Sequence, residues 1–386
     1  MTGLGPYLLV AAVAALLTWL LTPVVIRLAR RVGAVDRPGD RKIHAIATPT
    51  LGGLAIWGGF VGALLVAGRM DAFSRMFSFS TEPVGIAVGA TLMLAIGVVD
   101  DLYGLTAPAK LAAQVIAAAV MTLSGVQLLY VWLPFAEQIA ISPDIGVPLT
   151  ILVVIVTVNA VNLVDGLDGL AAGLVGIGAL AYFVFSYRTG PSGLYVGTAP
   201  PSAPLIAAIT VGACAGFLPH NFNPARVFMG DTGAMLLGTM LSAATITGVG
   251  RTTAPRVSDG IALVIPVAIP ILVLGLPFLD AAFAIVRRIR SGQGVMVADK
   301  AHLHHRLLEI GHSHRKAVLL LWLWSAFLAA STVALSFTGP SRVVPAFLLV
   351  FGIGAILLLA PQRRLGRARA DRPEVPRAAG RVDRPL

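Results

Sequence analysis

Five aspartates stand at points where long apolar stretches of the sequence end. They belong to a chain of 386 residues with only 18 acidic side chains, and they are Asp100, Asp101, Asp165, Asp168 and Asp231. A carboxylate at the centre of a bilayer costs about 2.5 to 3.5 kcal/mol, so five of them should share a polar cleft that water reaches. Carboxylate oxygens with few histidines nearby suit Mg²⁺, which keeps several waters and takes substrate phosphates as further ligands. The pattern therefore predicts metal-assisted chemistry on a phosphate group.

Each aspartate taken alone has a simpler explanation, which is that it caps a helix or ends a membrane span at the lipid headgroups. Asp231 is the clearest case, because Thr232 and Gly233 follow it in the manner of a helix start. Such a cap is compatible with a metal contact. Five aspartates on one face of the membrane favour the shared cleft over five separate caps.

Basic side chains lie on the same side of the predicted membrane as the aspartates. Phosphoryl transfer requires mainly positioning and charge neutralisation from a protein. The candidates for the positive charge are Arg41, Lys42, Lys110, Arg226, Arg287, Arg288, Lys300 and Arg306. The chain has no GxxxxGK(S/T) segment and no GxGxxG segment, which argues against an ATPase and against a dinucleotide-binding enzyme.

The elements that must position these side chains are transmembrane helices. The chain is 57% hydrophobic and 12% charged, against roughly 25% charged residues in a soluble domain. Apolar runs recur that are long enough to cross a hydrocarbon core of about 30 Å as helices. We predict an all-α, polytopic membrane protein with about eleven spans, at residues 3–26, 50–67, 83–99, 108–124, 147–161, 170–187, 203–219, 233–249, 260–286, 317–337 and 343–360.

Lys and Arg residues are distributed unevenly between the two sides of this arrangement. One set of connecting segments holds 23 of the 29 basic residues, and such an excess marks the cytoplasmic side. This places the N-terminus outside and the C-terminus in the cytoplasm. The net charge of +11 is therefore a membrane signal, and it does not indicate a nucleic-acid partner.

The two ends of the chain are interpreted separately from the core. Residues 3–26 lack a basic leading region and a small-residue cleavage site, so we expect a retained span and not a signal peptide. Residues 1–360 are predicted to form a single transmembrane domain. Residues 361–386 are rich in Arg, Pro and Ala, and should form a disordered cytoplasmic tail on anionic lipid. The outer segment 125–146 fits either an interfacial helix or a hairpin.

Five segments resemble one known family when they are taken in order. They read RPGDRKIHAIATPTLGG from Arg37, DDLYGL from Asp100, NAVNLVDGLDGLAAG from Asn159, NFNPARVFMGDTGA from Asn221 and DKAHLHHRLLEIGHSHRKAV from Asp299. The order resembles that of the polyprenyl-phosphate N-acetylhexosamine-1-phosphate transferases of glycosyltransferase family 4. The resemblance implies an eleven-helix fold in a bacterial cytoplasmic membrane, often dimeric, with its active site on the cytoplasmic face. It also implies that UDP-N-acetylglucosamine and polyprenyl phosphate, with undecaprenyl or decaprenyl chains, give polyprenyl-diphospho-N-acetylglucosamine and UMP.

The resemblance also assigns roles to the acidic residues. Asp231 matches the family's Mg²⁺ ligand, with Asn162 as a second ligand and Mn²⁺ as an alternative ion. Asp100 and Asp101 match paired aspartates for which metal binding and deprotonation of the lipid phosphate are both proposed. A phosphate monoester has a second pKa near 6 and is mostly dianionic at pH 7, so positioning and general-base roles both stay open. Asp165 and Asp168 are implied to contact substrate and metal, although a polar helix end would also explain them.

Three histidines and a set of polar residues complete the implied site. His302, His304 and His305 could bind zinc, but no Cys is near to complete a tetrahedron, and the family uses this motif to donate to a diphosphate. His312 and His314 are expected to be ordinary loop residues. The implied substrate contacts are Lys42, His44, Lys110, Asn159, Asn162, Asn223, Arg226, Arg287, Arg288 and Arg306.

Two other functions share some of these sequence features. Phospho-N-acetylmuramoyl-pentapeptide transferases share the aspartate motifs, but they typically carry three consecutive histidines before an acidic residue. Here Leu303 interrupts the histidines and Arg306 follows them, which resembles the N-acetylglucosamine branch. A transporter should place polar groups at mid-span and show two related halves, whereas here the polar motifs collect at one face and no internal repeat is found.

Overall fold

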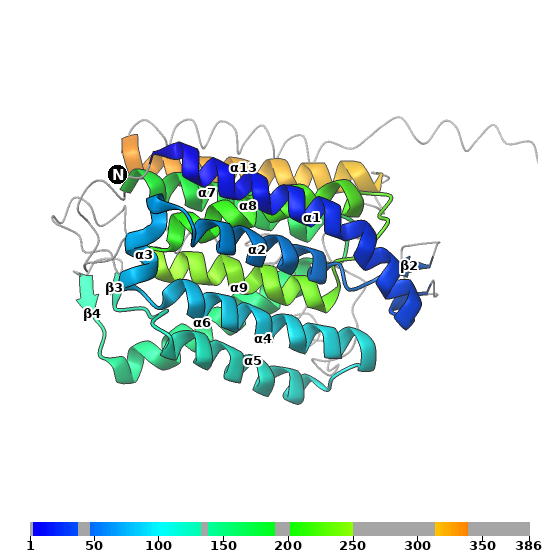
Figure 1. Cartoon of the computed structure of the whole chain (residues 1–386), viewed down its shortest axis with the longest axis horizontal. Helices are drawn as coiled ribbons and strands as arrows, with labels where there is room; N and C mark the ends of the chain where they lie inside the picture. The colour runs from blue at the N-terminus through cyan, green and yellow to red at the C-terminus, as the bar shows by residue number, and fades with distance from the viewer. Residues whose placement is uncertain (1–2, 38–46, 133–137, 190–200, 250–312, 339–386) are drawn as a thin grey trace, which may run out of the picture. The chain divides into compact units, whose positions relative to one another are not determined.

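The computed structural model describes residues 3–37, 47–132, 138–189, 201–249 and 313–338. Long helices dominate this part of the chain (Figure 1). They are α1 (Leu4–Val32), α2 (Gly53–Ala67), α3 (Ser74–Phe79), α4 (Glu82–Tyr103), α5 (Ala107–Leu123), α6 (Pro143–Val164), α7 (Leu170–Thr189), α8 (Ala203–Asn221), α9 (Gly230–Val249) and α13 (His314–Thr338). The prediction of a mostly helical protein is confirmed.

Six of the described helices have the length and the hydropathy needed to cross a membrane: α1, α4, α6, α7, α8 and α13. A short 3₁₀ turn (Asp71–Phe73) and α3 follow α2 at a bend of 88°, and this bent pair would make a seventh span. The chain is therefore a polytopic membrane protein. The predicted spans at 260–286 and 343–360 and the tail at 361–386 lie outside the described residues.

Glycine and proline set the ends of several helices. α1 ends at Gly33, whose left-handed backbone (φ 77°) lets its N–H bond to the carbonyl of Ala29. It runs six residues beyond the predicted end of the first span, because the basic residues Arg30 and Arg31 continue the helix in its last turn. α4 ends at Gly104 (φ 71°), whose N–H bonds to the carbonyl of Asp100. Pro83 and Pro108 lie in the first turns of α4 and α5, where a missing N–H costs no hydrogen bond.

α9 is the central helix of the described bundle. It packs against α2, α4, α6, α7 and α8, and residues 232–248 are buried. Small residues permit the closest of these approaches: a Cβ on Gly53 of α2 would collide with the backbone of Gly233, and one on Gly97 of α4 would lie 2.5 Å from Cα of Thr232. The first turn of α9 is therefore fixed between α2 and α4.

A two-stranded hairpin connects α1 to α2. Strand β1 (Val35–Asp36) pairs antiparallel with β2 (Thr48–Pro49), and the turn after β2 contains Leu51 with φ 67°. A left-handed leucine is strained, and here its side chain is buried in a cluster with Val25, Ala29, Ala34 and Ala55. The same turn hydrogen-bonds to the segment before α9, through Gly52 N–H to Phe228 O (3.1 Å) and Gly53 N–H to Met229 O (3.2 Å).

The segment between α5 and α6 forms a second hairpin. Strand β3 (Tyr130–Trp132) pairs antiparallel with β4 (Gln138–Ala140). Of the two alternatives that the sequence left open for residues 125–146, the structure therefore shows a hairpin, and α6 begins directly after it.

Candidate active site

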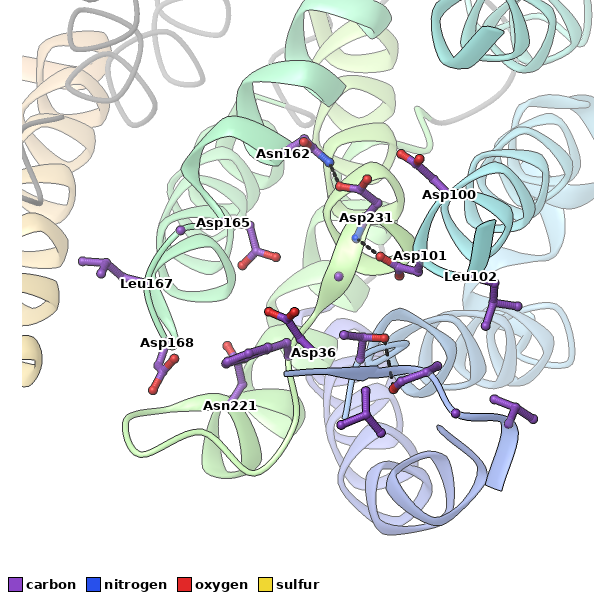
Figure 2. Close-up of a pocket in the computed structure, with 18 of the residues that line it drawn as sticks. Asp36, Asp100, Asp101, Leu102, Asn162, Asp165, Leu167, Asp168, Asn221 and Asp231 are labelled. Carbon is purple, nitrogen blue, oxygen red and sulfur yellow. Dashed lines mark hydrogen bonds between the residues drawn. The ribbon is translucent and has the colours of Figure 1, made fainter. Parts of the chain in front are cut away.

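The carboxylates gather around one cavity of about 710 Å³ at the ends of α4, α6 and α9 (Figure 2). The five aspartates that the sequence singled out all line it, together with a sixth, Asp36 on β1. Its other polar lining residues are Thr50, Asn162, Asn221, Asn223 and His314. The expectation of a shared polar cleft therefore holds, and the local charge of the described lining is strongly negative.

Lys110 lies between two of these carboxylates. Its ammonium nitrogen is 2.6 Å from Oδ2 of Asp100 and 2.7 Å from Oδ2 of Asp231. The start of α5 positions it, because the N–H of Lys110 bonds to the carbonyl of Thr106 in the first turn of that helix (2.9 Å). The other oxygen of Asp100 accepts the N–H of Leu105 (2.7 Å). Asp100 is thus held between the turn after α4 and a cation on α5.

Asp231 also contacts α6. Asn162, close to the end of α6, donates a hydrogen bond from its amide nitrogen to Oδ1 of Asp231 (Figure 2). Asp231 lies in the first turn of α9, and its carboxylate is directed at Asn162 and Lys110. Three helices therefore meet at this one side chain.

Asp101 contacts the start of α9. Its Oδ1 accepts the N–H of Asp231 (2.9 Å), and its Oδ2 accepts both the N–H (3.1 Å) and the hydroxyl (2.5 Å) of Thr232. The carboxylate that caps α9 therefore comes from α4. The simpler explanation of Asp231, as the cap of its own helix, is wrong.

Asp168 binds the loop between α8 and α9. Its Oδ2 accepts the side-chain amide of Asn223 (2.8 Å) and the N–H of Ala225 (3.1 Å). Its own N–H donates to Nε2 of His314 (3.0 Å). The expectation that His314 is an ordinary loop residue is wrong, because it lines the cavity and accepts this hydrogen bond.

Asp165 follows the last residue of α6 and faces the middle of the cavity (Figure 2). Burial, together with the negative charges of Asp101, Asp231 and Asp168, raises the pKa of Asp165 to about 8. Among the described residues, no three His, Cys, Asp or Glu side chains form a group that could hold a metal ion unaided.

A second polar contact lies one helical turn away from the cavity lining. Asn159 donates from its amide to Oε1 of Gln114 (2.7 Å) and to the carbonyl of Ile155 (2.9 Å). Gln114 is buried and stands four residues after Lys110 on α5. Sequence reasoning missed Gln114, although its spacing of i+4 from Lys110 places it on the same helix face.

Of the remaining candidates, Arg226 is described and the others lie outside the described residues. Arg226 is exposed and does not line the cavity. Sequence reasoning missed Asp36. Its position directly before the RPGDRK segment could have identified it as a candidate site residue. The candidates that lie outside the described residues are Lys42, His44, Arg287, Arg288, His302, His304, His305 and Arg306.

Known proteins resemble this chain along most of its length. A family model described as glycosyl transferase family 4 matches residues 83–249. The decaprenyl-phosphate N-acetylglucosaminephosphotransferase of Mycobacterium tuberculosis is 40% identical over 366 residues, which are 93% of this chain and 89% of that protein. A Bacillus subtilis protein named as an undecaprenyl-phosphate N-acetylglucosaminyl 1-phosphate transferase is 35% identical over 329 residues, 85% of each chain. The phospho-N-acetylmuramoyl-pentapeptide-transferase of Mycolicibacterium vanbaalenii is 30% identical over 368 residues, 86% of this chain and 97% of that protein.

Proposed function

The chain belongs to glycosyl transferase family 4, and we propose that it transfers N-acetylglucosamine 1-phosphate from UDP-N-acetylglucosamine to a polyprenyl phosphate. An oxygen of the lipid phosphate bonds to the phosphorus that carries the sugar. The bond from that phosphorus to the bridging oxygen breaks, and UMP leaves with this oxygen. The observation that carries the proposal is the acidic cavity, two of whose lining aspartates, Asp100 and Asp231, both contact Lys110.

A divalent cation fits the described residues. Two phosphate-bearing substrates would be repelled by a cavity lined by six aspartates, and Asp165 receives no hydrogen bond from any described residue. Mg²⁺ binds through one or two carboxylates, substrate phosphates and water, so it does not need a complete set of protein ligands. Asp231, with the amide oxygen of Asn162, would hold Mg²⁺ or Mn²⁺. The ion would neutralise the charge that develops on the diphosphate.

The chain's own residues position the reactants. A phosphate monoester is mostly dianionic at pH 7, so the attacking oxygen is deprotonated without a general base. Lys110, held between Asp100 and Asp231, places a positive charge beside the acidic lining and favours the approach of the anionic acceptor. Asp168 fixes the loop that carries Asn223 on the opposite wall.

The orientation in the membrane is part of the same proposal. For the proposed eleven spans, the excess of Lys and Arg on one set of connections supports an outer N-terminus and a cytoplasmic active site. UDP-sugars are cytoplasmic substrates, which suits this arrangement in a bacterial cytoplasmic membrane. A homodimer and contacts of the basic tail with anionic lipid are further elements of the proposal.

The rival functions have less support. Identity is 40% to a relative named for decaprenyl phosphate and N-acetylglucosamine, and 30% to one named for the muramoyl-pentapeptide reaction. The interrupted histidines around Leu303 also resemble the first branch. A transporter is disfavoured because the five aspartates that the sequence singled out line one cavity at the ends of α4, α6 and α9, and not at mid-span.

Release of UMP by the purified protein tests the proposal. The protein would be incubated in nanodiscs with decaprenyl phosphate, Mg²⁺ and one UDP-sugar at a time, with a control that lacks the lipid phosphate. We expect kcat/KM for UDP-N-acetylglucosamine to exceed that for UDP-N-acetylmuramoyl-pentapeptide at least about 100-fold, or about 2.7 kcal/mol in transition-state binding. Comparable values would contradict the choice of sugar. Absence of UMP with every sugar would contradict the reaction itself.

A further inference from the structure

The two adjacent aspartates of α4 have different partners. Asp100 binds Lys110 and the N–H of Leu105, whereas Asp101 binds the first turn of α9 (Figure 2). Successive residues of a helix are rotated by about 100°, so neighbours in the sequence need not face the same group. The two aspartates therefore stabilise different parts of the site.

The contacts of Asp101 are those of a helix cap supplied by another helix. The first N–H groups of an α-helix have no acceptor within the helix, and a negative charge near them is favourable. Asp101 accepts two such groups, from Asp231 and Thr232, although it is 130 positions from Asp231 in the sequence. The hydroxyl of Thr232 adds a third hydrogen bond. All three donors belong to the metal-site aspartate and its neighbour.

At two positions around this contact, the neighbouring atoms leave no room for a side chain larger than that of glycine. Gly230 has φ 70°, and a Cβ there would collide with Oδ2 of Asp101. A Cβ on Gly97, one turn before Asp101, would lie 2.5 Å from Cα of Thr232, which is itself fully buried. Two glycines thus bring α4 and α9 into direct contact on either side of Thr232. The close packing of α4 against α9 therefore depends on these glycines.

We propose that Asp101 and Thr232 form a latch that positions Asp231, and that Asp101 does not itself act on the reactants. The proposal rests on the proposed function in one respect, which is that Asp231 holds the metal ion. The N–H of Asp231 is fixed by Asp101 while its carboxylate faces Lys110 and Asn162. If the latch opens, the first turn of α9 frays and the carboxylate loses its orientation. Asp101 and Thr232 are positioning residues in this scheme.

Thr232→Val is the sharpest variant, because valine keeps the shape of threonine and replaces the hydroxyl with a methyl group that cannot donate a hydrogen bond. Thr232→Ser keeps the hydroxyl and serves as the conservative rescue. Thr239→Val is the matched control, since Thr239 is a buried threonine of the same helix whose hydroxyl bonds to the carbonyl of Met235 (2.8 Å). Asp101→Asn, the more disruptive change, would be compared with Asp100→Asn.

Three measurements on the full chain in detergent test the latch. Hydrogen–deuterium exchange of the peptide that contains Asp231 and Thr232 needs neither metal nor activity. Mn²⁺ affinity without substrates, measured by electron paramagnetic resonance, reports the orientation of Asp231. The pH profile of kcat/KM for Asp101→Asn reports any role in proton transfer.

We expect Thr232→Val to exchange faster at the start of α9 and to bind Mn²⁺ at least about tenfold more weakly. Thr232→Ser and Thr239→Val should resemble the wild type in both. The pH profile of Asp101→Asn should keep its shape, at a lower rate. Unchanged exchange and Mn²⁺ affinity in Thr232→Val, or loss of one limb of the pH profile in Asp101→Asn, would overturn the proposal. Because exchange is measured without substrates, failure of the proposed reaction would leave this test intact.

Discussion

The ammonium group of Lys110 lies 2.7 Å from Oδ2 of Asp231, and this contact joins helices α5 and α9 across 121 positions of the sequence. The same ammonium lies 2.6 Å from Asp100 on α4. One cation on α5 therefore connects α4 and α9, which carry the lining residues Asp100, Asp101 and Asp231. Its removal would leave two adjacent carboxylates without their shared counter-ion.

Lys110→Met should lower turnover at least about 100-fold, because it removes the positive charge while keeping the length and apolar stem of the side chain. UMP release in nanodiscs measures the effect. Arg69→Met is the control, since Arg69 is an exposed cation just after α2, away from the cavity, and it should keep full activity. Ordinary turnover by Lys110→Met would show that the cation is dispensable.

Asp168→Ala should destabilise the protein by about 1–3 kcal/mol, because the Asn223 amide and the Ala225 N–H would lose their common acceptor. Asp168→Asn keeps an oxygen at this position and should lose less. Thermal unfolding of the purified protein in detergent measures both. Asp71→Ala, at an exposed aspartate after α2, controls for loss of a carboxylate. Equal melting temperatures for all three variants would mean that the loop is held in another way.

Hydropathy alone located most of the described helices. Nine of the eleven predicted spans coincide with described helices to within a few residues, since an apolar run of that length leaves few alternatives to a buried helix. The short helix after the bend was not predicted, because the predicted span ends at residue 67 and the next segment, with Arg69 and Arg75, was assigned to an outer connection. The extension of α1 was missed because its last turns are basic.

The sequence predicted most of the acidic residues that form the site, but not which side chains contact one another. The aspartates and Lys110 stand out because charges are rare in this chain. Nothing local in the sequence encodes that Thr232 would bind Asp101, or that Gln114 would bind Asn159, because these pairs are 131 and 45 positions apart. Successive side chains of a helix are rotated by about 100°. The sequence alone could therefore have predicted that Asp100 and Asp101 have different partners.

Asp165 should make stability in the absence of metal depend on pH. Its folded-state pKa is raised to about 8 from 3.8, so the folded state binds the proton more tightly than the unfolded state. Its stabilising contribution is therefore complete below about pH 4 and is lost as pH rises through 8. In EDTA, the melting temperature of the wild type should fall between pH 5 and pH 9 more than that of Asp165→Asn. The two proteins should differ least at pH 5, and parallel curves over the whole range would contradict the assignment.

Gln114→Leu should lower turnover more than it lowers the stability of the fold. Gln114 is fully buried, accepts a hydrogen bond from Asn159 and contacts Sδ of Met235 at 3.8 Å. It therefore ties α5 to α6 one turn from Lys110 and Asn162, which both contact the carboxylate of Asp231.

Leucine has a similar volume and cannot accept the Asn159 amide, so the loss of stability should be about 1 kcal/mol. The loss of turnover should be larger, roughly tenfold in kcat, because small displacements of Lys110 and Asn162 misalign the reacting groups. Gln127→Leu is the matched control, since Gln127 lies just past the other end of α5 and donates to the carbonyl of Thr122 (3.2 Å). UMP release at saturating UDP-N-acetylglucosamine and thermal unfolding would be measured for both variants. If Gln114→Leu turned over as fast as Gln127→Leu, the contact between α5 and α6 would serve packing alone.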